Sequence, residues 1–153
     1  MLRTYEGPPE GYGHAAIIAM MRVQWRFHEL ASRMTKAHGL TLPHFDVLMT
    51  LRMAEGISQQ ELAKRLLVTK GNVCVIAQKL EIEGLIERRS DPTDQRFHRL
   101  YLTEAGRKML VKVYPEHRAL NARVMAGLSV AEQRTLHDLL ARVDQALDDI
   151  DSE

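Results

Sequence analysis

Side chains that can read nucleic-acid bases are concentrated between Thr69 and Lys79, in the stretch TKGNVCVIAQK. Asn72 and Gln78 each carry a hydrogen-bond donor beside an acceptor, the pair that matches an adenine edge in the major groove of DNA. Lysine suits a phosphate or a guanine, and valine can touch a thymine methyl group. The candidate contacts are Thr69, Lys70, Asn72, Cys74, Val75, Gln78 and Lys79. Lysine, asparagine and glutamine are also ordinary surface residues, so a solvated helix face explains any one of them equally well.

A second cluster of charged side chains follows in SDPTDQRFHRLYLTEAG, residues 90–106. The basic side chains in and just before this stretch could straddle a minor groove and its phosphates. They are Arg88, Arg89, Arg96 and Arg99. Asp94 lies two residues before Arg96, close enough to pair with it and hold the long guanidinium side chain extended. Asp91 precedes a proline and is expected only to shape the turn through hydrogen bonds to the backbone.

The first cluster opens a predicted helix over residues 70–84, in which apolar side chains recur at helical spacing and Thr69 is the N-cap. A shorter predicted helix, 58–66, precedes it and opens with Ser58 and Glu61 as a capping box. Two short helices joined by so short a turn indicate a helix-turn-helix motif. In that motif the early residues of the second helix lie in the major groove.

The charged cluster forms the tip of a predicted hairpin between strands 85–89 and 98–102, which makes the motif winged. Long helices flank it. They are predicted over 14–39, 41–56 and 104–128 and from Ser129 onward, with Thr41, Thr103 and Ser129 as N-caps and Pro115 as a kink.

The predicted fold is therefore mainly α, an α+β winged helix within one domain, residues 1–153. A winged helix-turn-helix DNA-binding module, 41–102, is flanked by dimerisation helices over 13–39 and 103–150. These helices are more apolar than one small module can cover, which predicts a homodimer.

Composition and charge distribution indicate the class of partner and the cellular compartment of the protein. The 153 residues carry a net charge of only +1, but Lys64 to Arg107 holds nine basic residues against six acidic ones, and DQALDDIDSE at the end has five acids and no base. A basic middle favours a polyanionic partner. The single cysteine excludes an intramolecular disulfide and favours the cytoplasm. Neither a membrane span nor a signal peptide is expected.

The stretch DPTDQRFHRLYLTEAGR resembles the signature of the MarR (multiple antibiotic resistance regulator) family, with an Asp-x-Arg pair followed by Leu-Thr-x-x-Gly. ELAKRLLVTKGNVCVIAQKLEIEGLIERR is similar to that family's helix-turn-helix and first wing strand. The resemblance implies a homodimeric repressor, less often an activator, on a pseudo-palindromic operator of double-stranded DNA. It also implies that Asp94 and Arg96 form the wing pair and that a small anionic or phenolic ligand, or cysteine oxidation, releases the DNA.

Two residues depart from the family's usual pattern in the second helix of the motif. Val75 stands where many members carry arginine, and Cys74 where serine or threonine is common. Oxidation of Cys74 would add bulk or charge beside DNA, which makes a redox-responsive regulator one alternative. The other interpretation, favoured here, is a small half-buried residue that packs like serine.

A small-molecule effector would bind, by the same resemblance, where the dimer helices meet the winged module. The candidate lining residues are Met21, Trp25, Arg26, His28, His44 and Asp46. Residues at helical spacing are more often plain core. A urate-responsive subgroup uses a tryptophan, an aspartate and two arginines, to which Trp25, Asp46 and Arg88 could correspond, while Ile76 replaces the remaining arginine.

Metal binding and catalysis find no support in the residue pattern. The seven histidines never fall three or four residues apart on one helix, and Cys74 has no cysteine partner, so no metal and no cofactor is predicted. No phosphate-binding loop or nucleophile elbow is present, so an enzyme is not expected. A winged-helix module that binds proteins instead of DNA is the remaining alternative. The effector, the operator, the regulated genes and the sign of regulation cannot be derived from the sequence.

Overall fold

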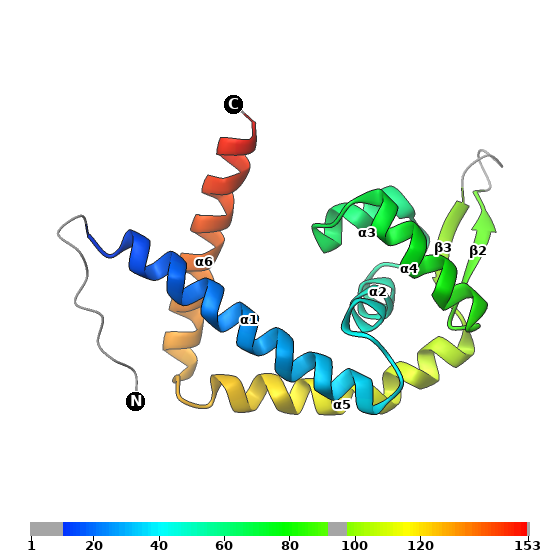
Figure 1. Ribbon diagram of the computed structural model, residues 1–153, viewed down its shortest axis with the longest axis horizontal. Helices are drawn as coiled ribbons and strands as arrows, with labels where there is room; N and C mark the ends of the chain where they lie inside the picture. The colour runs from blue at the N-terminus through cyan, green and yellow to red at the C-terminus, as the bar shows by residue number, and fades with distance from the viewer. Residues whose placement is uncertain (1–10, 92–97, 153) are drawn as a thin grey trace. The chain divides into compact units, whose positions relative to one another are not determined.

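The computed structural model describes residues 11–91 and 98–152, which form six helices and three short strands (Figure 1). In chain order they are α1 (Gly13–Ala37), α2 (Leu42–Met53), β1 (Ile57–Ser58), α3 (Gln59–Leu66), α4 (Lys70–Ile82), β2 (Ile86–Ser90), β3 (His98–Leu102), α5 (Glu104–Met125) and α6 (Val130–Asp151). The chain divides into two compact units, residues 1–116 and 117–153, with the boundary inside α5. The predicted mainly α winged-helix fold is confirmed. Within the two described ranges, no helix is both long and apolar enough to cross a membrane.

Five helices begin where their capping residues predict. The side-chain hydroxyls of Thr41, Ser58, Thr69, Thr103 and Ser129 each accept a hydrogen bond from the backbone N–H three residues further on. A complete capping box forms at Ser129 and Glu132. Of the capping box predicted at Ser58 and Glu61, only the bond to the Ser58 hydroxyl is present, because the Glu61 carboxylate pairs with Arg65 at 2.9 Å. These local bonds satisfy backbone donors that the first turn of a helix leaves free.

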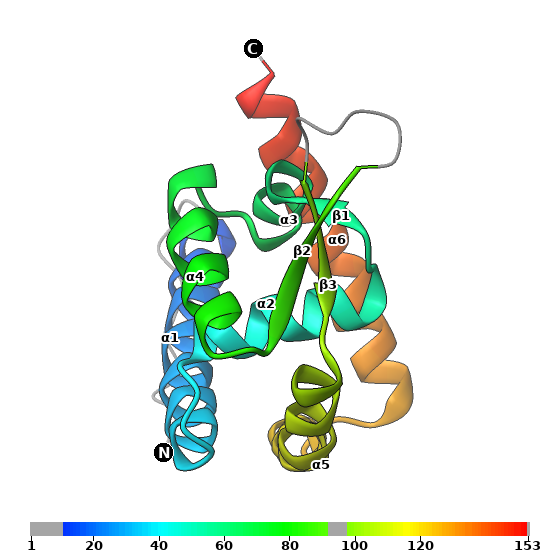
Figure 2. The same cartoon turned by 90° about the vertical axis from the view of Figure 1, so that its right-hand side faces the viewer.

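The sheet is three-stranded and antiparallel in the order β1-β3-β2, so β3 lies in the middle (Figure 2). Ile57 pairs with Leu100 across β1 and β3, and Arg89 faces Arg99 across β2 and β3. The strand β1 is absent from the sequence prediction. It has two residues, too few to show an alternating pattern, and Ser58 within it already caps α3.

The core of the first unit is built around α2, which is buried on most of its circumference, and the neighbouring elements add their apolar sides. Its largest fully buried side chains are Phe45, Leu48 and Leu51 of α2, Leu62 of α3, Leu80 and Val73 of α4, and Ile86, Leu100 and Val113. In α4 the buried positions are Val73, Ala77 and Leu80. This spacing of four and three residues turns one side of α4 inward and leaves the opposite side exposed.

The hairpin joins α5 through a close backbone contact. The Thr103 hydroxyl donates to the Gly84 carbonyl oxygen at 2.6 Å, and the Thr103 N–H donates to the Leu85 carbonyl oxygen at 3.1 Å. A Cβ atom on Gly106 would lie 2.1 Å from that same Leu85 oxygen. Glycine at position 106 therefore lets the first turn of α5 pack directly on the backbone that leads into β2.

Candidate nucleic-acid interface

All seven side chains predicted to read DNA lie on the exposed side of α4 or at its first turn. They are Thr69, Lys70, Asn72, Cys74, Val75, Gln78 and Lys79, all exposed in this unit. Val75 is 69% exposed and presents its two methyl groups between polar neighbours. The prediction that Cys74 is half-buried is wrong. Val73 takes the inward position beside it, so the thiol faces outward.

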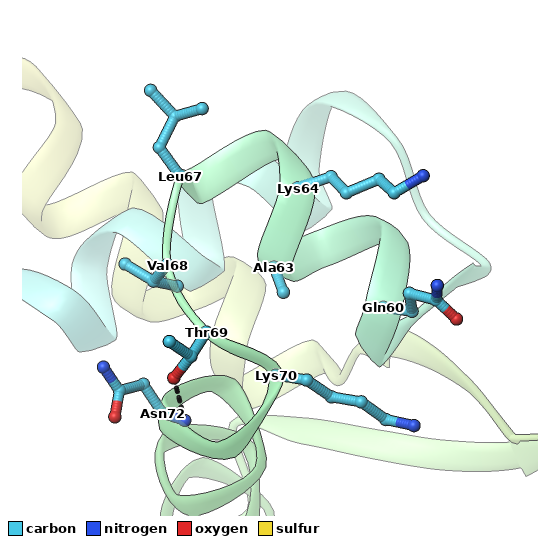
Figure 3. A pocket seen from close by; sticks show the side chains of 8 residues that line it. All are labelled: Gln60, Ala63, Lys64, Leu67, Val68, Thr69, Lys70 and Asn72. Atoms are coloured by element: carbon cyan, nitrogen blue, oxygen red, sulfur yellow. Dashed lines mark hydrogen bonds between the residues drawn. The ribbon is translucent and has the colours of Figure 1, made fainter. Parts of the chain in front are cut away.

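A shallow hollow of about 700 Å³ lies where α3 meets the start of α4 (Figure 3). Its lining residues are Gln60, Ala63, Lys64, Leu67, Val68, Thr69, Lys70 and Asn72. In Figure 3 the long side chains of Gln60, Lys64 and Lys70 extend to the same side. Sequence reasoning assigned no contact to Gln60 or Lys64. The available signal was their position on the first helix of the motif, the helix that crosses the DNA backbone in other helix-turn-helix proteins.

Leu67 turns the chain between these two helices. It has φ 53° and ψ 42°, the left-handed conformation, and it is the only non-glycine residue with positive φ in residues 11–91 and 98–152. Its side chain is 88% exposed. The Leu67 N–H donates to the Lys64 carbonyl oxygen at 3.3 Å, and the Val68 N–H donates to the Ala63 carbonyl oxygen at 3.1 Å. Backbone bonds of the α3 end therefore hold a strained residue beside the predicted DNA-reading helix.

Two of the predicted DNA-contacting arginines are paired with carboxylates, one on α4 and one on β2. Arg88 Nε lies 3.0 Å from Glu81 Oε2, which directs this half-buried guanidinium toward α4. Arg89 Nη2 donates to Glu87 Oε1 at 2.5 Å, and the Arg89 guanidinium carbon lies 4.4 Å from the centroid of the Tyr101 ring. Both charges therefore have carboxylate partners, and that of Arg89 stays on the exposed side of the hairpin.

Arg99 is held near the loop end of the hairpin. Its Nε donates to Asp91 Oδ2 at 2.5 Å and its Nη1 donates to the Gly56 carbonyl oxygen at 2.8 Å. Asp91, expected only to shape the turn, is a buried carboxylate in an ion pair. Asp94 and Arg96, the predicted wing pair, lie outside the described residues.

The predicted effector residues lie on α1 and at the start of α2 and do not line one shared cavity that the structure describes. Met21, Trp25, Arg26 and His28 of α1 are exposed, with Trp25 61% exposed, so they are not core of this unit. The buried side of α1 belongs to Ala31 and Thr35.

The two α2 candidates are His44 and Asp46. His44 is buried, its Nδ1 has no hydrogen-bond partner within the described ranges, and burial lowers the pKa of its imidazole. Burial raises the pKa of the half-buried Asp46 carboxyl to about 6, while the charge of the nearby His28 acts in the opposite direction. The charge of His28 on α1 therefore acts on the Asp46 carboxyl of α2.

A second hollow, of about 400 Å³, lies between the end of α2 and the first half of α5 and was not foreseen from the sequence. Its lining residues are Arg52, Leu102, Arg107, Leu110, Val111, Tyr114 and Pro115. The Arg52 guanidinium carbon lies 4.3 Å from the centroid of the Tyr114 ring. Arg107 donates to both carboxylate oxygens of Glu55, at 2.6 and 2.8 Å, and lowers the pKa of that carboxyl.

Metal coordination has no candidate group in this part of the molecule. Among residues 11–91 and 98–152, no three histidine, cysteine, aspartate or glutamate side chains are placed to hold an ion.

Comparison with known proteins agrees with this arrangement. The sequence model of the MarR family matches residues 38–96. The helix-turn-helix-type transcriptional regulator YkoM of Bacillus subtilis is 38% identical over 114 residues, 74% of each chain. The transcriptional repressor MprA of Escherichia coli is 36% identical over 132 residues, covering 82% of this chain and 74% of MprA.

A solved structure is similar over nearly the same span. The transcriptional repressor CouR, bound to a 23-mer DNA duplex, superposes with a TM-score of 0.77 at 28% identity, covering 88% of this chain and 97% of CouR. The predicted family is therefore confirmed, and the chain belongs to the MarR family of transcriptional regulators.

Proposed function

We propose that two copies of this chain bind a pseudo-palindromic DNA operator in the cytoplasm and repress transcription. The observation that carries the proposal is the exposed side of α4, where seven polar, small or basic side chains stand clear of the core. MprA is named a repressor and CouR was solved on DNA, which supports the same role here.

Within this interface, α4 reads bases and the flanking cations bind phosphates. Asn72 and Gln78 are assigned to base edges because their amides donate and accept together. Lys64, Lys70 and Lys79 are assigned to phosphates or guanine, as their exposure permits. Asp94 and Arg96 are assigned to the wing by the family resemblance.

The homodimer is proposed from the apolar side chains of the second unit. Among the α6 side chains that the structure describes, none is buried, although the helix carries an apolar row at helical spacing. The row consists of Leu136, Leu139, Leu140, Val143, Leu147 and Ile150. A second copy is the economical cover for such a row, and a two-fold dimer matches a palindromic operator.

The effector is proposed to be a small anionic or aromatic compound. The hollow at Arg52 and Tyr114 offers a guanidinium stacked on a ring beside apolar walls, a surface that suits an aromatic acid. The exposed Trp25 on α1 is the alternative position. Thermal-shift screening with aromatic acids and urate, repeated on Arg52→Ala and Trp25→Ala, distinguishes the two, and a hit must also release DNA.

DNA recognition is tested by titrating the protein's own upstream region by fluorescence anisotropy at several salt concentrations. Specific binding should weaken steeply with salt, with a slope of roughly −0.9 for each phosphate contact. Asn72→Ala should abolish the preference for the operator over random DNA. Asn121→Ala, an exposed asparagine on α5, is the matched control and should bind as the wild type does. Equal affinity of the wild-type protein for every sequence would contradict the proposal.

The wing assignment and the oligomeric state need separate measurements. Arg96→Ala should strongly weaken operator binding while the dimer stays folded. Unchanged binding at moderate salt would remove the wing pair from the interface. Analytical ultracentrifugation should find a dimer, and a monomer mass that stays constant with concentration would refute the homodimer.

A redox-responsive regulator is the second candidate, favoured by the exposure of Cys74 on the outward side of α4. Peroxide treatment should then weaken operator binding of the wild type and leave Cys74→Ser unaffected, since serine cannot be oxidised in this way.

A further inference from the structure

The centre of the sheet brings two arginines face to face. Arg99 lies on the middle strand β3, directly opposite Arg89 on β2 and Ser58 on β1. Like charges placed directly opposite destabilise a strand pair. In this hairpin each guanidinium has a carboxylate partner that offsets part of this cost.

The two arginines are compensated in different ways. Arg89 pairs with Glu87 of its own strand and lies over Tyr101, an arrangement confined to the exposed side of the hairpin. Arg99 instead uses Nε on the buried Asp91 carboxylate and Nη1 on the Gly56 carbonyl oxygen. Asp91 directly follows β2 and Gly56 directly precedes β1, so one guanidinium ties the middle strand to the ends of both neighbours.

The Gly56 end of this connection is itself constrained. The Gly56 N–H donates to the Leu100 carbonyl oxygen at 2.9 Å, and φ is +75°. A Cβ atom on Gly56 would lie 2.9 Å from the Tyr101 hydroxyl oxygen. Because β1 has only two residues, the bond from Arg99 to Gly56 adds to a short ladder between β1 and β3. Asp91, Arg99 and Gly56 are called the wing clamp below.

We propose that Arg99 is a positioning residue that fixes β3 against the ends of β1 and β2 through the wing clamp, and not a DNA-contacting cation as its charge suggests. The proposal rests on the proposed DNA-binding function. It divides the basic residues of the hairpin into two classes. Arg89 commits Nε and Nη2 to Glu87 of its own strand, whereas the two donors of Arg99 are committed to the ends of the two neighbouring strands.

The direction in which one substitution changes the affinity for DNA distinguishes the two possible roles of Arg99. Asp91 carries a negative charge close to a surface that binds a polyanion, so electrostatics alone predicts that Asp91→Asn strengthens DNA binding. The wing clamp predicts the opposite, because the neutral amide no longer holds Arg99 and the strand ends that carry the wing lose this connection. Glu87→Gln is the matched control, since it removes one negative charge from the same hairpin without touching the wing clamp.

Operator affinity is measured by anisotropy over a salt series for the wild type, Asp91→Asn, Arg99→Ala, the double variant and Glu87→Gln. Loss of a charge-assisted hydrogen bond predicts that each clamp variant binds about tenfold more weakly. The double variant should be no weaker than Arg99→Ala, and the slope of log affinity against log salt should stay at the wild-type value. Glu87→Gln should bind at least as tightly as the wild type.

A readout in the free protein completes the test. Amide hydrogen exchange at Gly56 should accelerate in Asp91→Asn and Arg99→Ala, because both loosen β1, and should not change in Glu87→Gln. Tighter binding by Asp91→Asn, or a salt slope about 0.9 smaller in Arg99→Ala alone, would overturn the proposal and make Arg99 a phosphate contact. If the wild type itself shows no operator preference, the proposed function fails, while the exchange result still decides whether the clamp exists.

Discussion

Substituting Gly106 with alanine tests the junction between the hairpin and α5. The added Cβ would lie 2.1 Å from the Leu85 carbonyl oxygen and 3.1 Å from its carbon. Both atoms belong to the backbone, so no side-chain rotation relieves the overlap. The first turn of α5 must move away from Leu85, which puts the two bonds of Thr103 to Gly84 and Leu85 under strain.

The expected magnitude follows from opposing contributions. Overpacking costs about 1–3 kcal/mol. Two weakened hydrogen bonds add about 1 kcal/mol each, while alanine regains about 1 kcal/mol of helix propensity over glycine. The free energy of unfolding should therefore fall by about 2–4 kcal/mol.

Urea unfolding followed by circular dichroism at one fixed protein concentration measures this change. Gly71→Ala is the matched control, since Gly71 also lies in the first turn of a helix and its added Cβ would meet nothing closer than 3.9 Å. It should be neutral or stabilising by up to about 1 kcal/mol. Equal effects of the two substitutions would refute the steric account of the junction.

Three further predictions concern other positions. Leu67→Gly should raise the free energy of unfolding by about 0.5–1 kcal/mol, because it removes left-handed strain without uncovering any buried side chain; a loss of stability in urea unfolding would show that the leucine is not strained. Burial raises the pKa of Asp46 to about 6, so between about pH 4 and 6 the carboxyl is ionised in the unfolded chain but still protonated in the folded protein. The free energy of unfolding therefore falls as the pH rises through this range. Asp46→Asn should therefore be more stable than the wild type by roughly 2 kcal/mol at pH 7 and by almost nothing at pH 4. The two proteins are compared at each pH, because the lowered pKa of His44 changes the stability of both in the opposite direction. A difference that does not depend on pH contradicts this. The exposed Cys74 should react fully with a thiol reagent in the folded protein, and protection until unfolding would place it in an interface.

Local features of this fold were predictable from sequence because their causes lie within four residues. The five capping hydroxyls act on an N–H three positions away, and the inward side of α4 follows from apolar side chains at helical spacing. The exposed reading side of α4 follows from the same pattern, since whatever does not face the core faces outward.

Features that depend on register or on a long-range neighbour were not predictable. Asp91 and Arg99 are eight residues apart, and only the pairing of β2 with β3 brings them together. Gly56, 43 residues from Arg99, meets it through the two-residue strand β1, which has no sequence signature. The exposure of Trp25 could not be derived either, because an apolar residue at helical spacing has the same pattern whether its own unit or a second chain covers it.

The left-handed turn at Leu67 offers a chemical route to separate folding from recognition. A D-residue prefers positive φ for the same steric reason that an L-residue avoids it. Semisynthesis with D-leucine at position 67 would keep the isobutyl group while removing the backbone strain. Comparing that protein with Leu67→Gly would measure what the exposed side chain itself contributes to DNA binding, if any, at matched backbone geometry.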